Sequence, residues 1–354
     1  MGALTSRERG VLAVIVVFAT LAGITRYANA APLLAFGAAT VALAGLAYVV
    51  SFATEQVGER FGPGITGLLQ STLGNLPELF VVIFALRAGQ TVVAQTSIIG
   101  SIFANALLVL GLVIVVGARR AQDGLMRFNK RLPNDTATLG LVTVFIIVII
   151  DLSVGSSDHA SHHVRAISTI GAVCILAVYA GWVIPYVRSD SGGGSEEGSH
   201  APRVALPLSL ALLGIAGVGS AFVSDWFIHA LQPSIEQLGV SQAFAGLVIV
   251  AIAGNAVENA TGLVLAYKRQ SDLAVSVVKN SVAQIGAFLF PVLVLISLVF
   301  THHLTFQLKP VYAGALALTA LSVWQITGDG EAAEFEGWAL VAIYVILGAL
   351  TLYE

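Results

Sequence analysis

The chain has 354 residues, of which 57% are hydrophobic and 10% are charged, and its formal net charge is −3. Because soluble domains carry about 25% charged residues, this composition excludes a soluble protein and indicates an integral membrane protein. The small negative charge, without a basic stripe, argues against a nucleic-acid partner. The single cysteine, Cys174, excludes a disulfide or a thiolate metal site within one chain.

Continuous apolar runs without strand-like alternation predict helices, because a helix satisfies its own backbone hydrogen bonds in lipid. A run of about 20 residues is long enough to cross a bilayer. We expect eleven such helices, near residues 10–25, 31–53, 64–87, 90–117, 135–152, 165–187, 204–226, 241–267, 272–299, 307–326 and 335–352. The predicted fold class is therefore an all-α membrane protein with about eleven transmembrane helices.

The first apolar run has two interpretations. Arg7 and Arg9 precede it, and Ala28-Asn29-Ala30 is similar to a signal-peptide cleavage site. The same residues also make an ordinary span with a basic inner flank, which is the interpretation adopted for residues 1–30.

Lysine and arginine are distributed unequally between the two sides of the predicted membrane. Twelve of the 17 flank the N-terminus or the loops after the second, fourth, sixth and eighth spans, against four on the opposite side. The positive-inside rule then places the N-terminus in the cytoplasm and, with eleven spans, the C-terminus outside.

One glycine- and serine-rich acidic linker, RSDSGGGSEEGSHAPR at residues 188–203, divides the chain. It separates five spans in 31–187 from five in 204–354, and five is an odd number. The second half is therefore expected to cross the membrane in the opposite direction, as an inverted repeat of the first.

Two short motifs support this repeat, Gly74-Asn75-Leu76-Pro77-Glu78 and Gly254-Asn255-Ala256-Val257-Glu258. A carboxylate inside an apolar span is costly, so a functional site is the first hypothesis. Within a helix, the Asn and Glu of each motif share a face. In the first copy the proline lacks an N–H, which frees the carbonyl of Leu73 as an oxygen ligand.

A second helix with polar side chains follows each motif. These residues are Ser97, Ser101 and Asn105 in the first half, and Asn280, Ser281 and Gln284 in the second. With the motif residues they supply carboxylate, amide and hydroxyl oxygens without sulfur or histidine. This ligand set suits Ca²⁺, Na⁺ or Mg²⁺ rather than zinc or copper.

The charge balance indicates antiport. Ionised Glu78 and Glu258 neutralise one divalent cation, and two protons neutralise the empty pair. An empty and doubly ionised site is strongly disfavoured. A site that always holds either the cation or protons is what alternating access between two inverted halves requires. The alternative is that both glutamates only join helices by hydrogen bonds.

Three longer segments contain or follow the two motifs: GLLQSTLGNLPELFVVIFALRAG, SIIGSIFANALLVLGL and GLVIVAIAGNAVENATGLVLAYK. They are similar to the paired signature repeats of the calcium/proton exchangers, in the cation/calcium exchanger superfamily, and the resemblance covers roughly residues 45 to 352. It implies ten core helices plus one peripheral first helix. It also implies that Glu78 and Glu258 bind the cation and exchange protons, with Asn75 and Asn255 nearby.

Residues beside the second motif depart from the family pattern. Asn259 stands where family members usually carry histidine, and Lys279 stands where small or apolar residues are usual. An ammonium group in the site would offset one carboxylate and favour a monovalent ion. Lys279 precedes Ser281 by two residues, or about 200° of helix, so we expect it to face away.

Asp329 and Glu336 belong to the closing segment ITGDGEAAEFEGWALVAIYVILGAL, which is also similar to the family. They have two interpretations, as an acidic loop that concentrates cations or as caps of a structural hairpin.

The expected function is a secondary Ca²⁺/H⁺ antiporter in a bacterial-type cell membrane, with no catalytic residues and no cofactor. A Na⁺ or K⁺/H⁺ antiporter on the same scaffold is the alternative. A cation channel is disfavoured because its filter usually needs a ring of subunits, and an intramembrane enzyme because no catalytic motif is present. The expected partners are the cation, protons and the lipid bilayer; the oligomeric state stays open.

Overall fold

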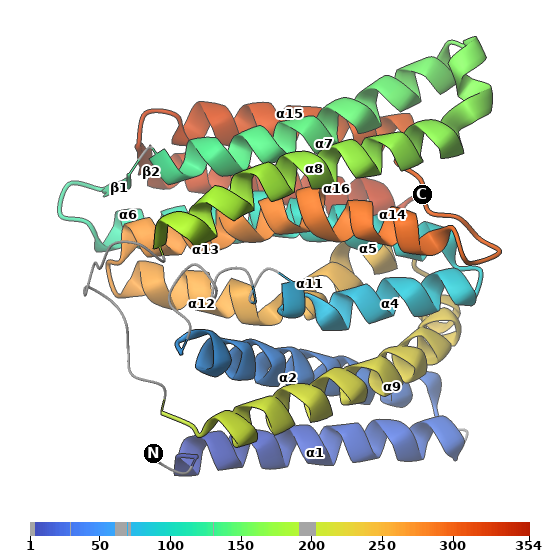
Figure 1. Ribbon diagram of the computed structural model, residues 1–354, viewed down its shortest axis with the longest axis vertical. Helices are drawn as coiled ribbons and strands as arrows, with labels where there is room; N and C mark the ends of the chain where they lie inside the picture. Colours follow the sequence, from blue (N-terminus) through green and yellow to red (C-terminus); the bar gives the residue numbers. More distant parts are fainter. Residues whose placement is uncertain (1–3, 29, 61–68, 70–71, 130, 191–202) are drawn as a thin grey trace. The chain divides into compact units, whose positions relative to one another are not determined.

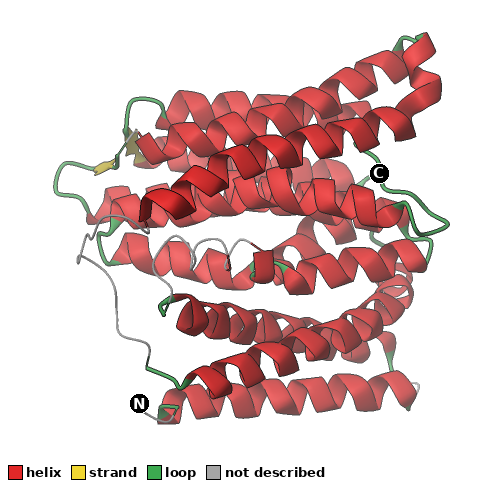
Figure 2. Ribbon diagram, viewed as in Figure 1, coloured by secondary structure: helices red, strands yellow, loops and turns green. Residues whose placement is uncertain are grey.

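The computed structural model describes residues 4–28, 30–60, 69, 72–129, 131–190 and 203–354. The predicted linker at 188–203 and the start of the third predicted span therefore lie largely outside the described residues. The described chain is almost entirely helical (Figure 2). It divides into two units, one of residues 1–88 and 180–239, the other of residues 89–179 and 240–354.

The first unit is built on the contact between two long helices, α2 (Pro32–Gly58) and α9 (Leu206–Leu238). Helix α1 (Ser6–Tyr27) lies against α2, and α4 (Leu76–Arg87) lies against α9. Small buried residues of α2, such as Ala38 and Ala42, allow this close approach. Helix α9 is followed by Gly239, whose φ of +66° is the left-handed conformation that glycine adopts without strain.

The second unit holds the remaining helices (Figure 1). They are α5 (Thr91–Phe103), η1 (Ala104–Val109), α6 (Leu110–Arg120), α7 (Arg131–Gly155), η2 (His159–His163), the first part of α8 (Val164–Asp190), α10 (Gln242–Phe244), η3 (Ala245–Val250), α11 (Ala251–Gly254), α12 (Ala256–Tyr267), α13 (Ser271–Gln284), η4 (Ile285–Leu289), α14 (Phe290–Ser297), α15 (Pro310–Thr327) and α16 (Glu334–Leu352). Phe103, Phe290 and Phe306 are fully buried in its core.

The transmembrane prediction is confirmed. Within the described residues nine helices are long and apolar enough to cross a membrane, and the bent pair 242–254 and 256–267 makes a tenth. These ten correspond to every predicted span except the one at 64–87. That span is described mainly as α4, whose 12 residues form its second part.

Matching elements occur 180 residues apart. Helix α4 covers 76–87 and α12 covers 256–267, while α5 begins at Thr91 and α13 at Ser271. A π-helical turn follows in both halves, as η1 and η4. Such turns are rare and concentrate at functional sites. This correspondence of element boundaries supports the proposed repeat.

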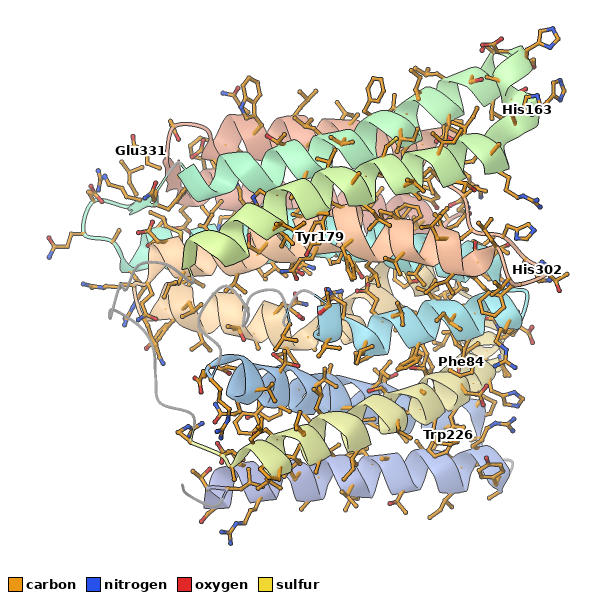
Figure 3. All side chains as sticks on the ribbon, viewed as in Figure 1. Phe84, His163, Tyr179, Trp226, His302 and Glu331 are labelled. Atoms are coloured by element: carbon orange, nitrogen blue, oxygen red, sulfur yellow. The ribbon has the colours of Figure 1, made fainter. Side chains whose placement is uncertain are left out.

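A short antiparallel ribbon was absent from the prediction. Strand β1 (Leu125–Arg127) pairs with β2 (Glu331–Ala333), and Glu331 is labelled on it in Figure 3. Arg127 contacts the carboxylates of Asp123 at 2.6 Å and Glu331 at 3.5 Å. The hydrogen bond from Arg127 holds the pKa of the Asp123 carboxyl below its usual range. Sequence periodicity could not reveal this pairing, because it joins two loops that are distant along the chain.

The ribbon also gives a structural role to both acidic residues of the closing segment. Asp329 Oδ1 accepts the N–H of Glu331 at 3.1 Å, and Glu336 Oε2 accepts the N–H of Ala333 at 2.7 Å. The two carboxylates therefore hold the turn and cap the start of α16, which favours the hairpin interpretation.

Candidate functional site

The first motif lies where a helix begins again after a break. Residues 72–73 are helical, Gly74 and Asn75 form a turn, and α4 starts at Leu76. Pro77 falls in the first turn of α4, where its missing N–H costs no hydrogen bond. Glu78 lies in the same turn and is 5% exposed. An anionic side chain at this position is stabilised by the positive end of the helix dipole.

The second motif has the same local structure without a proline. Helix α11 ends at Gly254 and α12 begins at Ala256, with a bend of 61° between the two segments. The side chain of Asn255 donates at 2.9 Å to the carbonyl of Ala251, which also accepts the backbone N–H of Asn255 at 3.2 Å. The second motif contains no proline that would signal this break in the sequence. Glu258 again lies in the first turn, and its side chain is partly buried.

Asn255 is the centre of a buried hydrogen-bond cluster in the second unit. Its amide nitrogen donates to Ser101 Oγ at 2.8 Å, and its amide oxygen accepts from Asn105 Nδ2 at 3.0 Å. Asn105 Nδ2 also donates to the carbonyl of Ser101 at 3.0 Å. All three side chains are at most 1% exposed. The structure thus joins the second motif to the polar stripe that follows the first motif.

The second unit also holds buried side-chain oxygens that have no hydrogen-bond partner in the described chain. Asn105 Oδ1 is buried and has no hydrogen-bond partner in the described chain, and the same holds for Ser281 Oγ and Asn259 Oδ1. Buried polar atoms are normally paired. These oxygens are therefore candidates for contact with a bound cation or water.

The other predicted polar residues contribute less. Ser97 is buried but donates to the carbonyl of Ala94 on its own helix at 3.0 Å. Asn280 and Gln284 are partly buried. Leu73 lies in the short helical stretch directly before the break, as the freed-carbonyl hypothesis requires.

Glycines bring the two helices of the cluster together. A Cβ atom on Gly100 would lie 2.5 Å from the backbone of Leu247, and one on Gly246 would collide with the side chain of Thr96. Because α5 and η3 touch through these positions, Ser101 and Asn105 come within hydrogen-bond distance of Asn255.

Lys279 points into another part of the second unit. Its ammonium donates to Thr327 Oγ1 at 2.6 Å, and its side chain is 8% exposed. No carboxylate of the described chain, Glu258 included, lies within the 4 Å of an ion pair with it. This placement agrees with the expectation that Lys279 faces away from the motif.

The comparison with protein families shows which family the chain belongs to. Residues 31–185 and 208–353 match the model described as sodium/calcium exchanger protein. The chain belongs to this family. The exchanger is therefore an integral membrane transport protein and not an enzyme.

Curated and solved relatives extend over most of the exchanger. The vacuolar calcium ion transporter of Schizosaccharomyces pombe is 32% identical, over 87% of this chain and 76% of that protein. The Ca²⁺/H⁺ antiporter ChaA of Bacillus subtilis is 30% identical, over 88% of this chain and 90% of that protein. The crystal structure of the Ca²⁺/H⁺ antiporter YfkE, 26% identical, superposes with a TM-score of 0.80 over 98% of this chain and 100% of that one. The resemblance inferred from the motifs is confirmed.

Proposed function

We propose that this exchanger moves Ca²⁺ and protons in opposite directions across the membrane by alternating access. The observation that carries the proposal is the doubled Gly-Asn-x-x-Glu, each copy opening a helix directly after a break. Broken helices are the usual ion-binding elements of transporters, because their ends offer unpaired backbone groups. The names of the relatives in B. subtilis and S. pombe support calcium as the cargo.

In the proposed mechanism Glu78 and Glu258 bind the cation and protons alternately. Asn75, Asn255 and the carbonyl of Leu73 supply neutral oxygens, which a hard cation such as Ca²⁺ needs to complete six to eight ligands. Ser97, Ser101, Asn105, Asn280, Ser281 and Gln284 form the supporting polar shell. Either occupant removes the repulsion between the two carboxylates, so cation release is coupled to proton uptake.

A divalent cargo is favoured over Na⁺ or K⁺ by the position of Lys279. Its ammonium is hydrogen-bonded to Thr327 rather than paired with Glu258, so it does not cancel the negative charge of the motif. Asn259 carries no ionisable proton, so proton transfer is assigned to the two glutamates alone. The monovalent exchanger remains the second candidate because both residues depart from the family pattern.

We place the N-terminus in the cytoplasm and the C-terminus outside a bacterial-type cell membrane. In each unit, a contact joins two segments that are predicted to lie on the same side of the membrane. Arg203 near the start of α9 bonds Glu8 at the start of α1 at 3.1 Å. At the opposite predicted side, Arg165 contacts His303 at 3.1 Å. Each contact joins segments that the positive-inside rule assigns to one side.

The deciding test uses purified protein in liposomes with an imposed pH gradient. Uptake of Ca²⁺, Na⁺ and K⁺ is followed separately for the wild type and for Glu78→Gln and Glu258→Gln, with the exposed Asp123→Asn as a matched carboxyl control. We expect proton-driven Ca²⁺ uptake in the wild type and the control, and none above empty liposomes in the two glutamine variants.

Two results would contradict the proposal at different points. Proton-coupled Na⁺ or K⁺ uptake without Ca²⁺ uptake would contradict the assignment of Ca²⁺ as the cargo but not the assignment of the binding site. Wild-type Ca²⁺ rates in both glutamine variants would remove the glutamates from the mechanism.

A further inference from the structure

The second unit contains a cavity of about 550 Å³ that lies apart from the two motifs. Helices α7, α13 and α15 form most of its wall, and no described residue of α4, α11 or α12 lines it. Its volume is in the range of about 300–1,000 Å³ typical of small-molecule sites. The cavity is therefore large enough for a ligand and distinct from the proposed cation site.

The cavity is long, apolar and open toward lipid. Along α15 its lining runs from Leu316 to Thr327, and these 11 steps span about 16 Å at 1.5 Å per residue. Leu141, Leu321 and Trp324 line it and are each more than half exposed. Exposed apolar side chains on transmembrane helices face the bilayer, so the cavity opens toward lipid where these three side chains lie.

One cationic group projects into this apolar space. Lys279 lines the cavity, and one of its three N–H groups is used by Thr327. Thr327 in turn donates to the carbonyl of Val323 at 2.6 Å, and Thr143 donates to that of Gly286 at 2.9 Å. The hydroxyl protons of Thr143 and Thr327 are thus engaged, and two ammonium protons of Lys279 stay available.

A buried ammonium without a counter-charge is unfavourable. Taking an ion out of water costs several kcal/mol even after relaxation, and an ionisable residue inside a membrane usually has a partner. In the described chain no carboxylate lies within ion-pair distance of Lys279. An anion bound in the cavity would supply the missing charge.

We propose that this cavity binds a free long-chain fatty acid. Its carboxylate would accept hydrogen bonds from Lys279, and its acyl chain would run along the apolar wall toward Leu316. A carboxylate matches the site because one cation neutralises one compact monoanion. A phospholipid headgroup needs several further donors, and two of the hydroxyls that line the cavity, those of Thr143 and Thr327, are already committed.

The test is equilibrium binding of radiolabelled palmitate to the purified, delipidated full chain in an uncharged detergent at pH 8. We expect one palmitate per chain. Lys279→Met should weaken binding by about 30-fold or more, the loss typical of removing one partner of a buried charge pair. Lys279→Arg should retain binding, and Lys268→Met, an exposed lysine of the same unit, should leave it unchanged.

A second variant and two competitors keep the proposal falsifiable if Lys279→Met folds poorly. Ala320→Phe fills the cavity and leaves the ammonium in place, so it should also abolish binding. Hexadecanol, which lacks the charge, should compete weakly. Unchanged palmitate binding in Lys279→Met or in Ala320→Phe would overturn the assignment. So would hexadecanol competing as well as palmitate, or phosphatidylglycerol displacing the label better than unlabelled palmitate.

Discussion

At the scale of single residues, Asn255 has two functions that the fold makes inseparable. Its amide nitrogen donates to the carbonyl of Ala251 in α11, and its remaining hydrogen bonds reach Ser101 and Asn105 on the neighbouring helix. The residue at the break between α11 and α12 therefore also holds the neighbouring polar side chains in position. Any change that moves the break also moves the proposed ligands.

We predict that Asn255→Ala destabilises the protein, whereas Asn259→Ala does not. The first change removes three hydrogen bonds, of which the two to Ser101 and Asn105 join different helices and are worth roughly 0.6 kcal/mol each, or about 1 kcal/mol together. Asn259 Oδ1 has no partner in the described chain, so its removal leaves no orphaned group. The midpoint of thermal unfolding in detergent measures both effects. Equal midpoints for the two variants would show that the cluster has no structural role.

At the scale of helices, the contact between α5 and η3 decides how close the polar residues can come. We predict that Gly100→Ala lowers the free energy of unfolding by about 1–3 kcal/mol, the usual cost of overpacking. The added Cβ would meet the backbone of Leu247 at 2.5 Å, so a flexible side chain cannot relieve the collision. Ca²⁺ uptake should fall as well, because Ser101 and Asn105 move away from Asn255.

Gly214→Ala on α9 is the matched control, since nothing lies within 4 Å of its added Cβ. Chemical unfolding in detergent should show no loss of stability for this variant. If Gly100→Ala behaves in the same way, helix α5 does not depend on glycine for its approach to η3.

Helices were also what the sequence predicted best. The apolar runs located the spans because lipid leaves the backbone few alternatives. The break at Asn255 has no proline to signal it, and its 61° bend is seen only in the structure. For the candidate site, the structure brings Ser101 and Asn105 of the predicted stripe together with Asn255 of the second motif. Their pairing with Asn255 depends on helix contacts that periodicity does not encode.

At the scale of the whole molecule, tertiary contacts added what no local pattern contains. The ribbon of β1 and β2 joins loops that lie about 200 residues apart along the chain. The cavity beside Lys279 is enclosed mainly by α7, α13 and α15, of which α7 lies far from the other two in the sequence. The proposed transport mechanism needs the two glutamates, which belong to different units, to act together. The direction in which the chain crosses the membrane is the first property to establish.

We predict that residue 162 is external and residue 122 is cytoplasmic. Single cysteines are introduced as His162→Cys, at the turn η2, and as Gln122→Cys, beside the ribbon, in a Cys174→Ala background. Both positions are exposed, so labelling reports side rather than burial. In intact bacterial cells an impermeant maleimide should modify only His162→Cys, and Gln122→Cys should react only after permeabilisation. The physical reason is the excess of lysine and arginine, twelve against four, on the side that holds residue 122. The reverse labelling pattern would invert the topology, and with it the side from which Ca²⁺ first reaches the glutamates.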